Sequence, residues 1–117
     1  MDREDTLQIV QSVNGNLIRV TARQWMHIVE AHDYMAGNMD LVLETVAEPD
    51  IILSGIRGEV LALRQYPTTN ISAKTAVVVY RDEQDGFIIT AFLTSQPDRI
   101  QRKREVLWRK LSSLTDN

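Results

Sequence analysis

The chain has 117 residues, of which 44% are hydrophobic and 25% charged, and this is the composition of one ordinary globular domain. It contains no cysteine, so disulfides, thiolate metal sites and cysteine nucleophiles are excluded. No apolar run reaches the roughly 20 residues of a membrane span. The polar start MDREDTLQ is unlike a signal peptide, and we therefore expect a cytoplasmic protein.

The charge is unevenly divided along the chain. A net charge of −3 argues against a general nucleic-acid binder. Residues 1–56 carry three basic and nine acidic residues, whereas residues 57–117 carry ten basic and seven acidic ones. A local basic face in the second half is therefore compatible with the acidic total.

The first half of the chain predicts two helices. Residues 1–8 have few apolar groups to bury, so we expect a disordered tail ahead of a single domain at 9–117. A turn signal at Asn14-Gly15-Asn16 precedes a short strand at 17–20. Thr21 then suits a helix N-cap, and the apolar stripe after it predicts a helix to about His32. A second helix is expected at 39–47, before Pro49.

Beyond Pro49 the pattern changes to that of strands, predicted at 51–53, 59–66, 74–81 and 87–94. Asp85-Gly86 is the turn signal of a hairpin between the last two strands. Pro97 opens a predicted helix that runs to about Leu114. The expected fold class is α+β, with N-terminal helices, an antiparallel meander of about four strands and a C-terminal helix.

The chain's two histidines, His27 and His32, fall in the first predicted helix. Five helical residues turn through about 500°, so the two rings point about 140° apart. A shared metal needs a spacing of three or four, and no metal site is expected. The simplest interpretation makes His27 a solvated residue and His32 a packed residue at the helix end. Because imidazole titrates near neutrality, either ring is also a candidate general acid or base.

Three cations lie on neighbouring predicted strands, namely Arg64, Lys74 and Arg81. Together they could bind a phosphodiester, although strand cations also serve to blunt an edge or to solvate a face. Lys74 and Arg81 have opposite parity on one strand, so one of them is expected to lie outside any site.

Several further residues are candidates for contact with a phosphate. Thr90 and Thr94 share one face of the last predicted strand, where hydroxyls can donate hydrogen bonds, and Tyr66 shares a face with Arg64. The basic run RIQRKREVLWRK is expected to form a core-packed helix with a solvated basic face. The alternative for this run is a helix that follows phosphates.

The stretch TARQWMHIVEAHDYM resembles a motif of phage and mobile-element nucleases of the barnase–EndoU–colicin–RelE-like group. That motif has a threonine, a glutamate-arginine pair, a tryptophan, histidine-isoleucine and a second histidine. The matching residues here are Thr21, Trp25, His27, Ile28 and His32. The segments ETVAEPDII and AVVVYRDEQDGFIITAF resemble later parts of the family, so the likeness covers about residues 17–94.

The chain departs from the family pattern at two pairs of residues. Arg23-Gln24 stands in place of glutamate-arginine, and Asp33-Tyr34 follows the second histidine in place of proline-glutamate. If either pair contributes to catalysis elsewhere in the family, the activity of this chain is called into question.

The resemblance implies a metal-independent endoribonuclease that needs no cofactor and acts on RNA as a toxin or mobile-element effector. A cognate antitoxin or inhibitor protein is the implied partner. Cleavage by attack of the 2′-hydroxyl needs a base, an acid and cations. The resemblance assigns catalysis to His32, with His27 as the alternative, and to Arg64, Arg81 and Thr90. It assigns substrate binding to Lys74, Thr94 and Tyr66.

A competing hypothesis is a non-catalytic protein-interaction or regulatory module on the same fold, which the acidic first half and the altered motif pairs favour. Such a module would bind through an apolar patch, and Arg64 and Arg81 would not meet near a histidine. A third hypothesis, a small-ligand pocket between helix and sheet, is neither supported nor excluded by the sequence.

Overall fold

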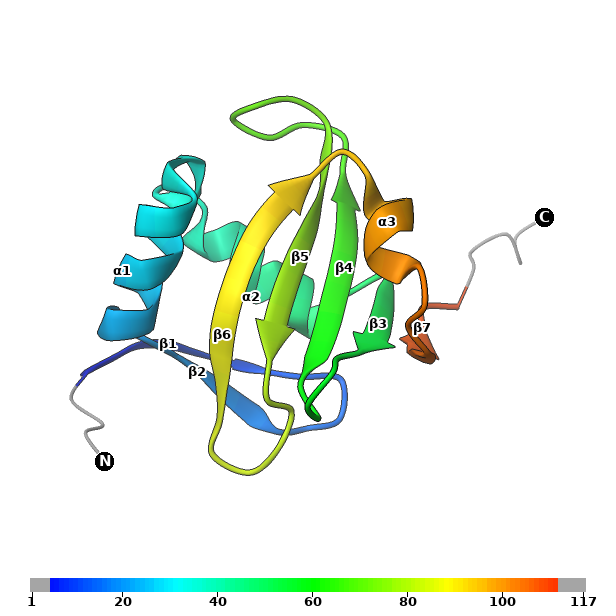
Figure 1. Ribbon diagram of the computed structural model, residues 1–117. Helices are drawn as coiled ribbons and strands as arrows, with labels where there is room; N and C mark the ends of the chain where they lie inside the picture. The colour runs from blue at the N-terminus through cyan, green and yellow to red at the C-terminus, as the bar shows by residue number, and fades with distance from the viewer. Residues whose placement is uncertain (1–4, 112–117) are drawn as a thin grey trace.

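The computed structural model describes residues 5–111, which form a seven-stranded mixed sheet with helices against it (Figure 1). The strand order is β1-β2-β6-β5-β4-β3-β7. Neighbouring strands are antiparallel except β2 and β6, which pair in parallel. The elements are β1 (Thr6–Gln11), β2 (Leu17–Thr21), α1 (Ala22–Ala31), the 3-10 turn η2 (Asp33–Met35), α2 (Met39–Ala47), β3 (Ile51–Ser54), β4 (Val60–Tyr66), β5 (Lys74–Tyr80), β6 (Gly86–Thr94), α3 (Pro97–Gln101) and β7 (Val106–Arg109).

The two longer helices begin and end where their sequences require. The hydroxyl of Thr21 accepts a hydrogen bond from the backbone N–H of Gln24 at 3.2 Å, as an N-cap does. Helix α2 carries Asp40 in its first turn, where a negative charge suits the positive end of the helix dipole. Among residues 5–111 no helix combines the length and the apolar character needed to cross a membrane.

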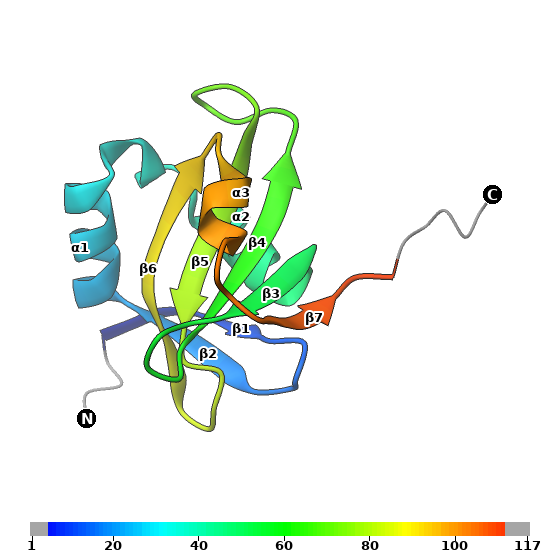
Figure 2. The same ribbon diagram turned by 45° about the vertical axis from the view of Figure 1, so that its right-hand side comes forward.

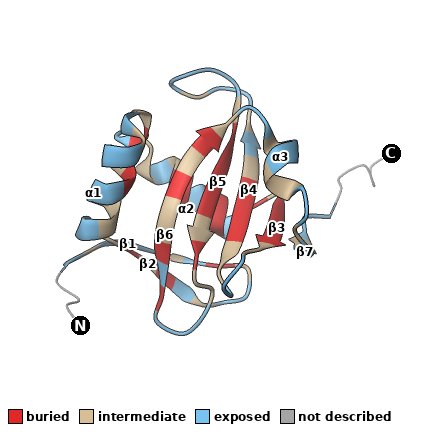
Figure 3. Ribbon diagram, in the orientation of Figure 1, coloured by how far each residue is buried: buried red, intermediate tan, exposed pale blue. Residues whose placement is uncertain are grey.

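Both faces of the sheet bury apolar side chains, so its central strands are covered on each side (Figure 3). The larger core lies toward α1 and α2 and includes Ile28, Val42 and Tyr80. A smaller cluster on the opposite face includes Leu63 and Val77, with α3 placing Ile100 against it. Burial on both faces explains why β5 is a nearly continuous apolar run, TAVVVY, instead of alternating with polar residues.

The outer edge of β6 is covered by side chains instead of a strand. Strand β2 pairs with β6 only at its start, through Ile18↔Gly86 and Arg19↔Phe87. Gly86 permits this close approach, since an added Cβ would lie 2.7 Å from Ile18 Cδ1. Beyond that point α1 lies along β6 (Figure 1), and the amide of Gln24 donates to the carbonyl of Ile89. The backbone groups of the strand edge thereby find partners.

Asp82 fastens the β1–β2 turn to the end of β5. Its carboxylate accepts hydrogen bonds from the Ser12 hydroxyl at 2.7 Å and from the side-chain amides of Asn14 at 2.7 Å and Asn16 at 2.9 Å. The three donors come from one short turn, about 70 residues earlier in the chain. These charge-assisted hydrogen bonds attach the β1–β2 turn to the rest of the sheet, to which the hairpin is otherwise paired only through β2.

The predicted order of helices first and a four-stranded meander second is wrong, because two strands precede the helices and the sheet has seven strands of mixed direction. The predicted disordered tail at 1–8 also differs, since Thr6 to Gln8 belong to β1, while residues 1–4 lie outside the described residues. Strand β1 is an exposed edge strand with few buried groups, so its strand state depends on pairing with β2 and not on an apolar pattern of its own.

The single C-terminal helix predicted from Pro97 to Leu114 is also wrong. Helix α3 ends at Gln101, and Lys103 has a positive φ of 64°, which a helix does not accommodate. The chain then forms β7, which pairs with β3 through Ile51↔Arg109 and Ile52↔Trp108 (Figure 2). Pairing with the free edge of β3 outweighs the helical spacing of the apolar residues. Residues 112–114 of the predicted helix lie outside the described residues.

We predict that Asp82→Ala lowers the free energy of unfolding by about 1–3 kcal/mol, because three donors lose one charged acceptor and Ser12 is buried. Urea denaturation followed by circular dichroism measures the change. Glu83→Ala is the matched control, as Glu83 is an exposed neighbour with the same charge. Equal stability of the two variants would contradict a stabilising role for the hydrogen bonds of Asp82.

Candidate functional site

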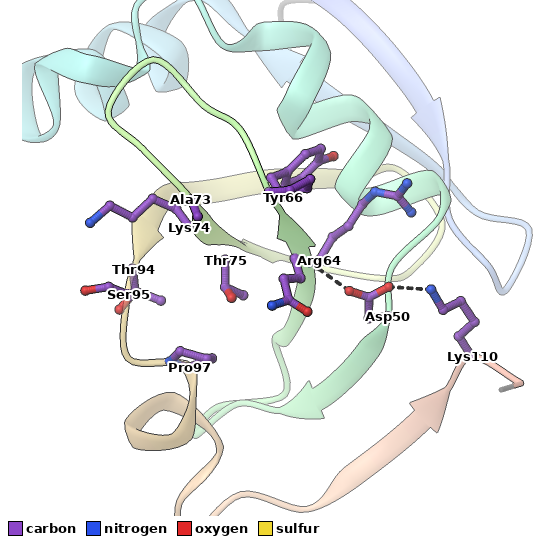
Figure 4. A pocket seen from close by; sticks show the side chains of 12 residues that line it. Asp50, Arg64, Tyr66, Ala73, Lys74, Thr75, Thr94, Ser95, Pro97 and Lys110 are labelled. Carbon is purple, nitrogen blue, oxygen red and sulfur yellow. Dashed lines mark hydrogen bonds and ion pairs between the residues drawn. The ribbon is translucent and has the colours of Figure 1, made fainter. Parts of the chain in front are cut away.

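A cleft of about 660 Å³ lies at the end of the sheet where β4, β5 and β6 approach α3. Residues from five separate parts of the chain line it. They are Asp50, Arg64, Gln65, Tyr66, Pro67, Ala73, Lys74, Thr75, Thr94, Ser95, Pro97 and Lys110. Figure 4 shows Thr94 and Ser95 on one side of the cleft and the Asp50–Lys110 pair on the other. Its volume falls in the range of ordinary small-molecule sites.

Hydroxyl groups line the part of the cleft formed by β5 and β6. Thr75 and Thr94 are direct partners in the β5–β6 register, so their side chains lie next to each other on one sheet face. Ser95 follows at the end of β6. Strand alternation places Gln65, between Arg64 and Tyr66, on this same face. The lining therefore offers several uncharged hydrogen-bonding groups within one cavity.

Asp50 and Lys110 form an ion pair across the opposite wall, with Nζ 2.7 Å from Oδ1. Burial by itself raises the pKa of the Asp50 carboxyl. The hydrogen bond from Lys110, the backbone N–H of Gln65 and the positive charges of Lys110 and Arg64 outweigh burial, so the pKa lies below its ordinary value of 3.8. Asp50 is thus a carboxylate in the neutral range, and Lys110 is largely neutralised by it.

The guanidinium of Arg64 extends toward the side of α2 (Figure 4). Its Nη1 donates to the carbonyl of Glu48, the C-cap of α2, at 2.6 Å, and its Nε lies 3.7 Å from the carboxylate of Glu44. A cation at this point suits the negative end of the helix dipole. Arg64 therefore fixes α2 to β4 and contributes only part of its charge to the cleft.

Tyr66 lies under Arg64, with the guanidinium carbon 5.5 Å from the ring centroid. Its hydroxyl donates to Glu44 at 2.7 Å. Burial, followed by the negative charge of Glu44, raises the pKa of Tyr66 to about 12 although a hydrogen bond with Thr45 opposes the shift. The phenol is therefore neutral at physiological pH and serves as a hydrogen-bond donor and not as a base.

Lys74 is the cation of the cleft that is left uncompensated. Its side chain makes no hydrogen bond or ion pair with any residue in the range 5–111, and the residue is partly exposed. Arg64 and Lys110, by contrast, each have a carboxylate partner. An anion entering the cleft would therefore meet Lys74 as its first uncompensated charge.

His32 lies at the C-terminal end of α1, where it is the C-cap. Its ring packs against Phe92 of β6 at a centroid distance of 5.6 Å and against Tyr34 at 5.7 Å. Its Nδ1 lies 3.4 Å from the Tyr34 hydroxyl. Phe92 shares a sheet face with Thr94, two residues further along β6, so His32 sits at the edge of the strand that forms one wall of the cleft.

The other predicted catalytic residues lie elsewhere. His27 is exposed on α1 with its Nδ1 3.9 Å from Glu30. Arg81 donates to the carbonyl of Arg57 at 2.7 Å and so holds the β3–β4 turn. Thr90 lies at the bulge of β6, and neither it nor Arg81 lines the cleft. Lys74 lines the cleft at the start of β5, whereas Arg81 follows Tyr80 at the other end of the strand. Thr75, of opposite parity to Lys74, also lines the cleft, so parity does not account for this difference.

The cleft thus brings together Arg64, Tyr66, Lys74 and Thr94 of the predicted site residues, whereas His27, His32, Arg81 and Thr90 do not line it. Sequence reasoning missed Asp50, Lys110 and Thr75. The Asp50–Lys110 pair joins residues 60 positions apart, and it depends on β7 reaching β3, which the sequence did not predict. Thr75 could have been found, because it shares a strand parity with Val77 on the face opposite the helices.

No three histidine or carboxylate side chains among residues 5–111 gather closely enough to hold a metal ion. Comparisons of the chain with protein-family models, with curated proteins and with solved structures found no match.

We predict that Lys110→Gln raises the pKa of Asp50, because burial remains while the strongest opposing hydrogen bond and charge are lost. A carboxyl-detected NMR titration measures it. In the wild type the depressed pKa stabilises the fold above the ordinary value of 3.8, and this contribution is lost as pH falls through the lower folded value. Stability of the variant should therefore vary less in that acidic window.

Lys103→Gln is the control, since it removes the same charge from a position that does not line the cleft. An Asp50 titration that is identical in wild type and Lys110→Gln would show that the pair does not govern this carboxyl.

Proposed function

We propose that this chain is a metal-independent endoribonuclease-like domain that holds the backbone of RNA in the cleft and uses His32 as its acid–base group. One observation carries the proposal. The cleft combines the free cation Lys74 with the hydroxyls of Thr75 and Thr94, and the same strand β6 carries Phe92, on which the His32 ring packs. The likeness of the segment Thr21–Tyr34 to phage and mobile-element nucleases supports the same chemistry.

The charges of the cleft suit one phosphodiester and not a long run of them. Lys74 supplies an uncompensated charge, Arg64 and Lys110 supply partial ones, and hydroxyls and Gln65 supply hydrogen bonds. Phosphate contacts position a nucleic acid without selecting its sequence. With a net charge of −3 for the whole chain, we expect modest affinity that falls steeply with salt.

Cleavage in this proposal follows from the 2′-hydroxyl of the RNA itself. The neutral imidazole of His32 takes the 2′-hydroxyl proton, the 2′-oxygen forms a bond to phosphorus, and the bond from phosphorus to the 5′-oxygen breaks. The leaving 5′-oxygen takes a proton from solvent, and the product is a 2′,3′-cyclic phosphate. Lys74 and the hydroxyl donors would stabilise the charge that develops on the phosphate oxygens. Such an enzyme would act in the cytoplasm, and a cognate inhibitor protein is the partner we expect of a toxin.

We predict that the wild type cleaves single-stranded RNA in the presence of EDTA and that His32→Ala lowers the rate by about 10²–10⁴-fold, as for loss of a general base. Electrophoresis and mass spectrometry of a labelled oligonucleotide measure the rate and the cyclic phosphate. The same oligonucleotide made with deoxyribose should stay intact.

The variant His27→Ala separates the two histidines, because His27 is exposed on α1 beside Glu30, whereas the His32 ring packs on Phe92 of β6. We expect it to retain the wild-type rate. Intact RNA with the wild-type protein, or equal rates for wild type and His32→Ala, would overturn the catalytic proposal.

We also predict that Lys74→Gln weakens RNA binding several-fold and lowers the slope of log affinity against log salt by about one phosphate contact. Fluorescence anisotropy with His32→Ala as the background measures binding without cleavage. Lys103→Gln, with the same charge change outside the cleft lining, is the control. Equal effects of the two substitutions would mean that the cleft is not where RNA binds.

A second candidate is the protein-interaction module, and the β1–β2 hairpin favours it. Ile9, Leu17 and Phe87 are 53%, 58% and 39% exposed, and the strand register places them on one outer face. Arg64 and Arg81 are also held at separate turns of the fold, away from either histidine. If RNA stays intact and unbound while a partner protein is displaced by Ile9→Asp, this second function replaces the first.

A further inference from the structure

Tyr34 makes three polar contacts with one hydroxyl. Its oxygen accepts a hydrogen bond from the backbone N–H of Leu93 at 3.2 Å, lies 3.4 Å from the carbonyl of Leu93, and lies 3.4 Å from Nδ1 of His32. The side chain is partly buried against the main core, and it follows His32 by two residues in η2. It therefore joins the histidine to the open edge of β6.

The count of donors and acceptors selects one arrangement of protons. A phenol hydroxyl has one proton and can accept two hydrogen bonds. If it donates to the carbonyl of Leu93 and accepts from both the Leu93 N–H and a protonated Nδ1, all three contacts are hydrogen bonds. If Nδ1 carries no proton, the hydroxyl must turn to it, and the Leu93 carbonyl loses this donor. The first arrangement makes one hydrogen bond more.

The second nitrogen of the ring is correspondingly free. Nε2 of His32 has no hydrogen-bond partner among residues 5–111, and the ring is partly exposed at the side of Phe92. With the proton on Nδ1, Nε2 holds a lone pair and can take a proton. The imidazolium formed in this way keeps its Nδ1–H on Tyr34, so neither charge state requires the ring to turn.

We propose that Tyr34 is a positioning residue whose hydroxyl, anchored on the backbone of Leu93, holds His32 as the Nδ1–H tautomer and so makes Nε2 the nitrogen that exchanges protons with the substrate. This inference deepens the proposed endoribonuclease function and rests on it for the identity of the substrate. The tautomer of His32 is a property of the protein without RNA, so it can be measured whether or not the protein cleaves RNA.

The experiment is a two-bond ¹H–¹⁵N correlation spectrum of uniformly ¹⁵N-labelled protein, recorded above the titration range of histidine. In the wild type we expect the Nε2 of His32 to show the shift of an unprotonated nitrogen and Nδ1 that of a protonated one. Tyr34→Phe should move the population by several-fold toward the Nε2–H tautomer, which a free histidine side chain prefers. Tyr80→Phe is the matched control, since the buried Tyr80 hydroxyl has no hydrogen-bond partner in the described residues.

A wild-type His32 that is mainly Nε2–H overturns the proposal, even if Tyr34→Phe does not fold. An unchanged tautomer in a folded Tyr34→Phe also overturns it. If the tautomer moves as expected and wild-type protein leaves RNA intact, Tyr34 positions His32 but the endoribonuclease function fails. If RNA is cleaved, Tyr34→Phe should lower kcat several-fold with little change in KM.

Discussion

The open edge of β6 carries backbone groups that must find hydrogen-bond partners, because β2 pairs with that strand only at its beginning. Gln24 and Tyr34 provide those partners from α1 and η2. Covering an edge with a helix also prevents the strand from pairing with another chain. Because α1 covers the edge of β6 and supplies these partners, the same contacts fix the position of His32 at the end of α1.

The same strand links the two parts of the proposed site. On one side of β6, Thr94 lines the cleft and Phe92 packs against the His32 ring. Their neighbour Leu93 is buried toward the helices and contacts Tyr34 through its backbone. The helix that covers this edge therefore also holds an imidazole against the strand that forms one wall of the cleft, although His32 itself does not line the cleft. In the proposed function Tyr34 and His32 have both a structural and a chemical role, and a measurement on the ring itself is needed to separate the two.

Several of the cations that the sequence concentrates in residues 57–117 make contacts that hold the fold together. Arg64 binds the end of α2, Arg81 binds the β3–β4 turn, and Arg104 donates to the carbonyl of Ser54 at 3.1 Å. Charges in such contacts are compensated by carbonyls and carboxylates, so they add little field to the cleft. This is why a count of basic residues overstates the affinity for an anion, and why Lys74 has more weight here than its neighbours.

The parts of the fold that the sequence predicts well are those whose apolar pattern is set by burial. Strands β4, β5 and β6 and helices α1 and α2 agree with the predicted ranges because their buried faces recur at strand or helix spacing. Strands β1 and β7 escaped prediction because they are edge strands with mostly exposed side chains. Their conformation is decided by the strands they pair with, the neighbouring β2 for β1 and the distant residues Ile51 and Ile52 of β3 for β7.

The site likewise contains residues that could be named from the sequence and residues whose place depends on strand pairing. Arg64, Lys74 and Thr94 were named from their residue types on predicted strands, although the register places Thr94 on the opposite sheet face from the other two. The Asp50–Lys110 wall required the pairing of β7 with β3. His32 was found from its residue type, but its environment comes from Tyr34 and Phe92, which no spacing rule joins. A histidine held through one nitrogen has a defined free lone pair, and that lone pair is useful only where a substrate hydroxyl can reach it. Thr94 of the same strand lines the cleft, so in the proposed function the tautomer of His32 and the occupant of the cleft are linked questions.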